Sequence, residues 1–322
     1  ANQKYTAAVA VAAEACAEDT KGQTCYICTQ ALHWKTKEGL VRGCACRGTA
    51  GFAHVSCLAE QAKLLNEEAE ENGLFGTERG KLRWRRWTTC SLCEQGYHGV
   101  VYCALGWACW KTYLGRPRGP EADWLRGAAM TLLGNGLFLT EHYADASSVF
   151  KARYSTLRRT GASEHYLLVA AGNLANSYQA LGRCEEALRL RQEVYSGHLK
   201  LNGEEYYETL REANNYASSL IDLQRFKEAR SLMRKTIPMT RRVLEKHDDL
   251  VLRMRWNYAK ALYNDPGATL DDLREAVTTF EEIGPTARRV LGGAHPDTRG
   301  IEDELRDARA ALRAREAPPT TA

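Results

Sequence analysis

The chain has 322 residues, which is enough for two domains, or for one small domain followed by an array of repeats. Its formal net charge of +4 is mild and by itself argues neither for nor against a nucleic-acid partner. No apolar run approaches the roughly 20 residues that span a bilayer. The Ala-rich stretch 6–17 contains Glu14 and lacks the basic start of a signal peptide. We therefore expect a soluble chain without a membrane partner. Its first residue is Ala rather than Met, which suits a fragment or a processed form.

Residues 1–20 are expected to form a flexible lead-in. The stretch that follows contains eight candidate zinc ligands, arranged as four close pairs. They are Cys25 and Cys28, Cys44 and Cys46, His54 and Cys57, and Cys90 and Cys93. Structural zinc sites need four thiolate or imidazole ligands, usually offered as close pairs from tight turns. Buried cysteines acting as small apolar side chains would not explain the polar, Gly-rich sequence around the pairs. The pattern predicts two Zn²⁺ ions.

The order of these ligands is C4HC3, which the RING-CH (RINGv) finger and the PHD finger share. The stretch from Cys44 to Leu58 closely resembles the RING-CH core, in which a CxC-x-GT run leads to HxxCL. PHD fingers usually have an aromatic residue two positions before the seventh ligand, whereas Trp87 lies three positions before Cys90. The resemblance implies a cross-brace in which the first and third pairs share one ion. One zinc would then bind Cys25, Cys28, His54 and Cys57, and the other Cys44, Cys46, Cys90 and Cys93.

Apolar residues at helical spacing from Val55 to Leu65 predict a helix that ends near Asn72. It lies in the long gap between Cys57 and Cys90, so we expect a helical insertion that returns at residues 81–87. Arginines and tryptophans alternate in that return, which would suit a nucleic acid. Because the run is short and the overall charge low, we expect the tryptophans to pack on the zinc core and no nucleic acid to bind.

The four cysteines outside the zinc pairs are scattered, which favours a reducing compartment, the cytoplasm or alternatively the nucleus. They are Cys16, Cys103, Cys109 and Cys184. His98, Cys103 and Cys109 suggest a third metal site, but they lack a close pair and a fourth ligand. We expect instead a buried helix or strand that seals the finger. The finger with this segment spans residues 21–114, and the turn-rich residues 115–120 form a linker.

The second half of the chain, 121–316, is repetitive. Asn173, Asn215 and Asn257 each begin a similar helical motif, and successive motifs are 42 residues apart. A helix pair repeated at a fixed period, with small Ala at the crossing, is typical of a helical solenoid. Residues 121–159 are expected to be a degenerate first pair and 297–315 a capping helix, followed by a disordered tail, 317–322. The fold class expected is a small zinc-stabilised cross-brace finger followed by an all-α tetratricopeptide-type solenoid.

The long repeat period and the sequence from Leu291 to Thr298 resemble kinesin-light-chain tetratricopeptide repeats. In that family the groove binds short peptides, and helix asparagines hold the peptide backbone. By position, Asn173, Asn215 and Asn257 match those asparagines. The alternative is that they form hydrogen bonds between repeats, since Asn inside a helix has poor intrinsic propensity and needs a partner.

RING-CH fingers act as ubiquitin ligases, so the resemblance implies a RING-type ubiquitin transferase without a covalent catalytic residue. The finger would bind a ubiquitin-charged conjugating enzyme, and the repeats would hold a peptide or protein substrate. Ile27 lies where such fingers present an apolar contact, beside Leu92, with Trp84 or Trp87 completing the patch. Two alternatives stay open: a non-catalytic protein-interaction adaptor, and a PHD-like reader of histone tails.

Overall fold

The computed structural model describes residues 1–74, 76–117, 119–244 and 248–316. In these residues the structure is helical, and β-structure is limited to two isolated bridges, Val41 with Ala53 and Thr89 with Gly96. The chain divides into two compact units, Ala1–Gly161 and Ala162–Ala322. None of the helices in the described ranges is long and apolar enough to cross a membrane.

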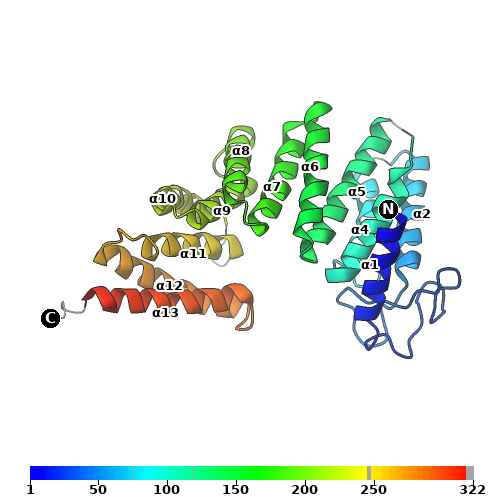
Figure 1. Cartoon of the computed structure of the whole chain (residues 1–322), viewed down its shortest axis with the longest axis horizontal. Helices are drawn as coiled ribbons and strands as arrows, with labels where there is room; N and C mark the ends of the chain where they lie inside the picture. The colour runs from blue at the N-terminus through cyan, green and yellow to red at the C-terminus, as the bar shows by residue number, and fades with distance from the viewer. Residues whose placement is uncertain (75, 118, 245–247, 317–322) are drawn as a thin grey trace. The chain divides into compact units, whose positions relative to one another are not determined.

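The first unit contains the zinc-ligand loops and six α-helices (Figure 1). These are α1 (Asn2–Ala15), α2 (Val55–Glu71), α3 (Glu78–Trp84), α4 (Gly99–Leu114), α5 (Pro120–Leu139) and α6 (Tyr143–Arg159), with a 3₁₀ turn, η1 (Arg85–Trp87), after α3. The second unit contains α7 (Glu164–Ala180), α8 (Cys184–Asn202), α9 (Tyr207–Asp222), α10 (Phe226–Val243), α11 (Asp249–Tyr263), α12 (Leu270–Val290) and α13 (Pro296–Glu316). A cysteine-rich finger followed by helix pairs is the fold class that the sequence predicts.

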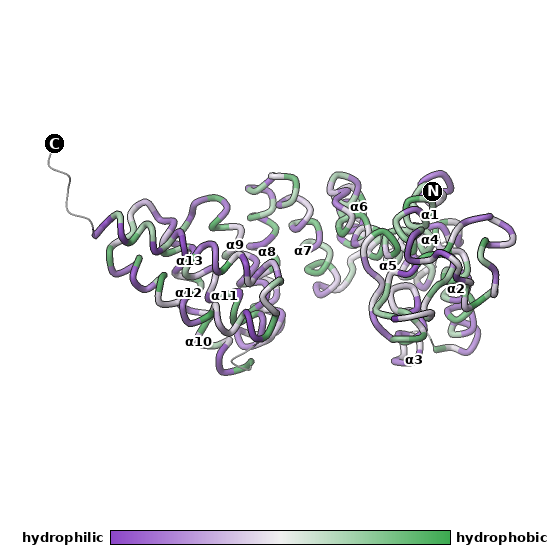
Figure 2. Tube along the Cα trace, turned by 90° about the horizontal axis from the view of Figure 1, so that it is seen from below, coloured by the Kyte–Doolittle hydropathy of each residue, from purple (hydrophilic) through white to green (hydrophobic). Residues whose placement is uncertain are grey.

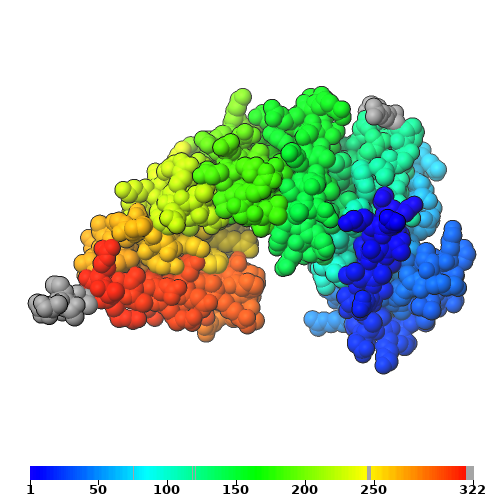
Figure 3. Space-filling model, in the orientation of Figure 1, coloured from blue at the N-terminus to red at the C-terminus, as the bar shows by residue number. Residues whose placement is uncertain are grey.

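Helix α1 corrects the expectation of a flexible lead-in. Its Val9 and Ala12 are buried in the core that surrounds the zinc ligands, and α1 packs against α4. Tyr5 bonds to Ser56 at the start of α2, with 3.1 Å between the two hydroxyl oxygens. Alanine is the strongest helix former, so the Ala-rich sequence folds here even though its apolar stripe is narrow. The space-filling view shows α1, in dark blue, on the surface of its unit (Figure 3).

Helix α4 is the segment expected to seal the finger, and it contributes to two separate cores. Val101 and Leu105 pack in the zinc-side core, whereas Cys109 and Tyr113 pack with Leu125 of α5. Figure 2 shows green, apolar stretches where α4 and α5 are labelled, and both helices bury many apolar residues, as expected for helices that are covered on several sides. Cys103 and Cys109 are both buried and serve there as small apolar side chains. Among the described residues, neither belongs to a metal-binding cluster.

The segment expected as a linker, 115–120, does not separate the two units. Arg116 binds both carboxylate oxygens of Glu70 in α2, at 2.7 and 2.8 Å, and its backbone carbonyl accepts a hydrogen bond from Arg126. The units instead divide at Gly161. The helix pair α5–α6 therefore belongs to the same compact unit as the finger.

Glycines let α4 and α5 pack closely. A Cβ atom on Gly136 would lie 2.7 Å from the Cα atom of Cys103, and one on Gly106 would lie 3.0 Å from the Cα atom of Leu133. These contacts are with backbone atoms, so a rotamer change cannot relieve them. The close approach explains why α5 packs against the finger rather than extending the second unit.

We expect Gly136→Ala to destabilise the first unit by about 1–3 kcal/mol, as overpacking does, although Ala is the better helix former by about 1 kcal/mol. Gly172→Ala in α7 is the matched control. A Cβ there has no neighbour within 4 Å, so only the propensity gain of about 0.5–1 kcal/mol remains. Urea unfolding followed by hydrogen exchange in each unit would measure both effects. Stabilisation by both substitutions would contradict the close packing.

The turns inside three helix pairs have the same geometry. Glu141, Gly182 and Gln224 occupy the left-handed region with φ of 63°, 71° and 58°. In each pair the next residue donates its backbone N–H to a carbonyl five residues earlier, at 2.8–2.9 Å, and so ends the first helix. The α5–α6 turn thus matches the turns of α7–α8 and α9–α10, as expected if residues 121–159 are a degenerate copy of the later pairs.

The second unit is a succession of packed helix pairs. Each helix from α7 to α13 packs against the next, and α9 also packs against α11. Small alanines are fully buried in these helices, among them Ala187, Ala229 and Ala259, as the solenoid pattern predicts for helix pairs that cross closely. Pro238 lies inside α10, and α13 is the expected final helix. The tail predicted for 317–322 lies outside the described residues.

Candidate metal centres and repeat surface

The first and last cysteine pairs form two turns with the same backbone. In each turn the third residue, Ile27 or Leu92, directs its backbone N–H to the sulfur of the first cysteine at 3.4 Å. The residue after the second cysteine, Thr29 or Glu94, has a left-handed φ of 62° or 56° and donates its N–H to the carbonyl of the first cysteine. Both thiols therefore project from one side of a tight turn, as a tetrahedral ion requires.

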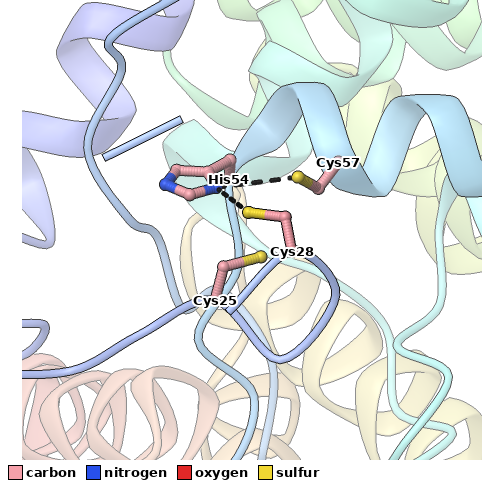
Figure 4. A group of neighbouring side chains, drawn as sticks. All are labelled: Cys25, Cys28, His54 and Cys57. Atoms are coloured by element: carbon pink, nitrogen blue, oxygen red, sulfur yellow. Dashed lines mark hydrogen bonds between the residues drawn. The ribbon is translucent and has the colours of Figure 1, made fainter. Parts of the chain in front are cut away.

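The first cluster joins Cys25 and Cys28 to His54 and Cys57 (Figure 4). His54 precedes α2 and Cys57 lies in its first turn. Nδ1 of His54 lies 3.4 Å from Sγ of Cys28 and 3.6 Å from Sγ of Cys57. Around a tetrahedral zinc with ordinary bond lengths, a nitrogen and a sulfur ligand are about 3.6 Å apart. The cluster has the size and composition of a structural zinc site.

The other ring nitrogen of His54 fixes the orientation of the ligand. Nε2 lies 3.3 Å from the backbone carbonyl oxygen of Ala31, which can accept its hydrogen. Such a contact selects the tautomer in which Nδ1 is free to bind a metal, and it is typical of zinc-bound histidines. His54 is completely buried, and burial lowers its pKa, so the neutral ring is favoured.

The second cluster joins Cys44 and Cys46 to Cys90 and Cys93. Sγ atoms of Cys46 and Cys90 are 3.8 Å apart, which matches the sulfur separation of about 3.8 Å expected around tetrahedral zinc. Gly51, with φ of 86°, passes close to this cluster, because a Cβ on it would lie 2.9 Å from Sγ of Cys46. No side chain fits there without displacing a ligand.

The thiols of the second cluster have opposed proton affinities. Burial raises the pKa of Cys44 well above its usual value and that of Cys46 to about 11, whereas a backbone hydrogen bond with Gln95 lowers the pKa of Cys93 to about 7. Buried thiols become thiolates only when a cation compensates their charge. Four converging thiols therefore fit Zn²⁺, and the two clusters together fit two zinc sites in the cross-braced order expected from the sequence.

The residues expected to contact a conjugating enzyme divide into two groups. Ile27 is 37% exposed and Leu92 is 51% exposed, and the neighbouring Tyr26 and Ser91 link the two turns through hydroxyls 3.0 Å apart. Trp87, in contrast, is completely buried, so its expected surface role is wrong. Its ring packs edge-on against Tyr113 in the core shared with α4.

Trp84 is only partly buried, yet its ring is also engaged. It packs against Tyr113 and lies edge-on to Trp124 of α5, with ring centroids 5.5 Å apart in both pairs. The tryptophans of the basic return thus pack beside the insertion helices and α5 rather than beside Ile27. They pack in a core, as expected, but it is the core that α4 shares with α5 and not the zinc-side core.

The three repeat asparagines lie on the first helices of successive pairs and are partly buried. Asn257 donates to Oδ1 of Asn214 at 2.9 Å, a bond between neighbouring first helices. Asn215 donates to Glu212 in its own helix at 3.2 Å. The bond of Asn257 is of the kind that the inter-repeat alternative predicts, and Asn173 and Asn215 show no such bond among the hydrogen bonds described.

A buried ion pair in the second unit was not anticipated. Arg191 of α8 and Glu212 of α9 have side chains only 4% and 7% exposed, with 3.4 Å between the charged groups. Arg191 also donates to Asn176 of α7. The signal in the sequence was a charged residue on the buried stripe of α8, between Ala187 and Val194.

Comparisons with known proteins agree with this architecture. The model of the RING-variant domain matches residues 25–72, and the model of the tetratricopeptide repeat matches residues 166–241. A search of the curated proteins finds no match.

Among solved structures, the chain is similar to the TPR-like repeats of a Podosopora anserina protein described as a kinesin light chain. The sequences are 21% identical, the TM-score is 0.50, and the alignment covers 59% of this chain and 88% of the other. BtubC (BKLC) from P. vanneervenii is also similar, at 12% identity and a TM-score of 0.49, covering 83% and 94%. The first likeness shows the fold of the helical part. The chain therefore combines a RING-variant zinc finger with tetratricopeptide repeats.

Proposed function

We propose that the protein is a ubiquitin-protein ligase that acts in the cytoplasm. Its finger binds a ubiquitin-charged conjugating enzyme, and its repeats hold a protein substrate. The observation that carries this proposal is the pair Ile27 and Leu92, two exposed apolar residues at equivalent positions of the two zinc turns. The contact between Tyr26 and Ser91 holds these turns together, so both residues belong to one surface.

Helix α2 extends this surface. Gln61 and Leu64 follow the zinc ligand Cys57 at helical spacings of four and seven residues, so the three share one face of α2. Leu64 is 55% exposed. Because Cys57 lies in the same ligand cluster as Cys25 and Cys28, which flank Ile27, we assign this face of α2 to the same proposed surface. Exposed apolar side chains grouped on ordered elements are typical of a protein-binding surface.

The chemistry proposed for the finger is positional. A finger that holds a conjugating enzyme restrains its ubiquitin thioester so that a substrate lysine can attack it, and no side chain of the finger forms a covalent bond. The zinc ions supply the rigidity of the two turns. The repeats would raise the local concentration of the substrate, with Asn173 and Asn215 as candidate contacts to a peptide backbone.

The test is autoubiquitination by the zinc-loaded chain with a panel of conjugating enzymes, comparing wild type with Ile27→Ala and Leu92→Ala. We expect chains with wild type and at least about a tenfold loss in each variant, which corresponds to about 1.4 kcal/mol of lost binding. Leu139→Ala, which changes a 57% exposed leucine of α5, is the matched control and should stay active. Metal analysis must show full zinc in every variant.

The adaptor alternative rests on Glu94. It is exposed directly after the last ligand, where active fingers often place a basic group that contacts ubiquitin. An absence of ubiquitin chains from zinc-loaded wild type across the whole panel would contradict the ligase and favour the adaptor. The histone-reader alternative would need exposed aromatic residues around a peptide groove, and the buried Trp87 cannot be one of them.

A further inference from the structure

The first unit contains a cleft that none of the zinc ligands lines. Its volume is about 710 Å³, and its walls come from α1, α2, α4 and the loop 33–36. The residues that matter are Tyr5, Trp34, Lys35, Glu60, Lys63 and Lys111; we name it the Trp34 cleft. None of the residues proposed to contact the conjugating enzyme lines it, although Glu60 and Lys63 of the cleft are chain neighbours of Gln61 and Leu64 in α2.

The Trp34 cleft carries excess positive charge. Lys35, Lys63 and Lys111 come from three different elements, and Glu60 is the only acidic residue in the lining. Glu60 forms an ion pair with Lys63, with 3.3 Å between Oε1 of Glu60 and Nζ of Lys63. Lys111 lies over the ring of Tyr5, 4.7 Å from its centroid, and Lys35 forms no ion pair with any residue that the structure describes. Two of the three cations therefore lack a carboxylate partner.

An exposed tryptophan stands beside these lysines. Trp34 is 68% exposed, and Leu32 in the same loop is 58% exposed. A large aromatic side chain in water is unusual in a folded protein, and tryptophan is enriched at the energetic centres of protein interfaces.

The loop that carries Trp34 is ordered by its buried neighbour. Nδ1 of His33 accepts a hydrogen bond from the backbone N–H of Thr36 at 3.1 Å. The backbone N–H of His33 donates to the carbonyl of Glu38 at 3.0 Å, and the carbonyl of His33 accepts from the N–H of Lys37 at 2.9 Å. The backbone that carries Trp34 is thus ordered before any partner arrives, which lowers the backbone entropy that binding would lose.

We propose that the Trp34 cleft binds an acidic peptide segment. Carboxylates of the peptide pair with Lys35, Lys63 and Lys111, and an aromatic or aliphatic residue packs on Trp34. The cations are all lysines, which act as point charges and lack the planar fork with which arginine grips one phosphate. Three such charges on separate elements match negative charge spread along a chain better than a single anionic group. The site does not depend on ligase activity.

The probe is a short fluorescein-labelled peptide of alternating Glu and Tyr, with a Gln–Tyr peptide as its neutral twin. Binding to the zinc-loaded full chain is followed by fluorescence anisotropy. We expect the acidic peptide to bind at least about tenfold more tightly than its twin, with an advantage that shrinks as salt rises. Phosphatidylserine vesicles and a single-stranded oligonucleotide are run as competitors.

Variants locate the site. The double variant Lys35→Glu and Lys111→Glu, and separately Trp34→Ala, should weaken the acidic peptide at least about tenfold. Lys37→Glu is the matched control, since Lys37 is an exposed lysine of the same loop that does not line the cleft. The proposal would be overturned if the two peptides bound with equal affinity, or if Lys37→Glu weakened the acidic peptide as much as the cleft variants do. It would also be overturned if the vesicles or the oligonucleotide bound to the chain and the acidic peptide did not. Ubiquitin transfer plays no part in this readout.

Discussion

Removing zinc is expected to unfold the finger while the second unit stays folded. Structural zinc sites contribute about 10–16 kcal/mol each, which equals or exceeds the whole stability of a typical domain, about 5–15 kcal/mol. Residues 25–54 contain no helix and no β-structure beyond the isolated bridge of Val41 with Ala53, so their backbone depends on the ligands. After chelation, hydrogen exchange should show these amides unprotected and α7–α13 still protected. Acid should act in the same direction, because protons compete with zinc for the thiolates.

Two cysteine variants make this expectation specific. Cys44→Ser removes a ligand and should lower the zinc content from two ions toward one, with loss of protection around the second cluster. Cys184→Ser changes a cysteine of α8 outside both clusters and should keep both ions. Equal zinc contents in the two variants would rule out the assigned ligand set.

The second large effect is expected at the buried ion pair of the repeats. Arg191→Met leaves Glu212 charged and only 7% exposed, and breaking a buried pair in this way costs about 3–5 kcal/mol. We expect a cost at the lower end of this range, because the Glu212 carboxylate still has two partners. It pairs with Arg211 at 3.2 Å and accepts a hydrogen bond from Asn215 at 3.2 Å. The measurement is chemical unfolding of the second unit, followed by the protection of α8 and α9.

Two comparisons identify burial as the cause. Arg191→Met combined with Glu212→Met removes both charges and should recover much of the loss, since a buried pair is often replaceable by apolar residues. Arg274→Met breaks two exposed ion pairs, with Asp271 and with Glu316; the arginine side chain is 54% exposed and the two carboxylate side chains are 92% and 42% exposed. It should cost at most about 1 kcal/mol. An equal loss for Arg191→Met and Arg274→Met would show that the buried pair has no special role.

The zinc sites could be predicted from the sequence because their ligands come from short, local spacings. Cys25 and Cys28 fit one ion whatever the rest of the chain does, and the same holds for Cys90 and Cys93. Ile27 and Leu92 each lie between the two cysteines of such a pair, so the same spacing places both on the zinc turns. The repeats were predictable for a similar reason, since the 42-residue period places equivalent residues on equivalent helices.

Features that depend on contacts distant in sequence could not be predicted in this way. The core in which Trp87 packs depends on Tyr113 of α4, and the packing of α5 against α4 depends on the close approach of Gly136 to Cys103. Helix α1 was missed because its Ala-rich sequence shows little difference between its faces. In each case the deciding partner comes from another helix, and local pattern does not reveal it.

Helix α4 also determines where the chain can be cut. Proteolysis between Leu114 and Pro120 would separate α4 from α5 and leave Cys109 and Tyr113 without Leu125. The released finger would present this apolar strip to water and tend to aggregate. A cut after Gly161 would keep α4, α5 and α6 together, so this is where a soluble fragment that retains both zinc ions should end.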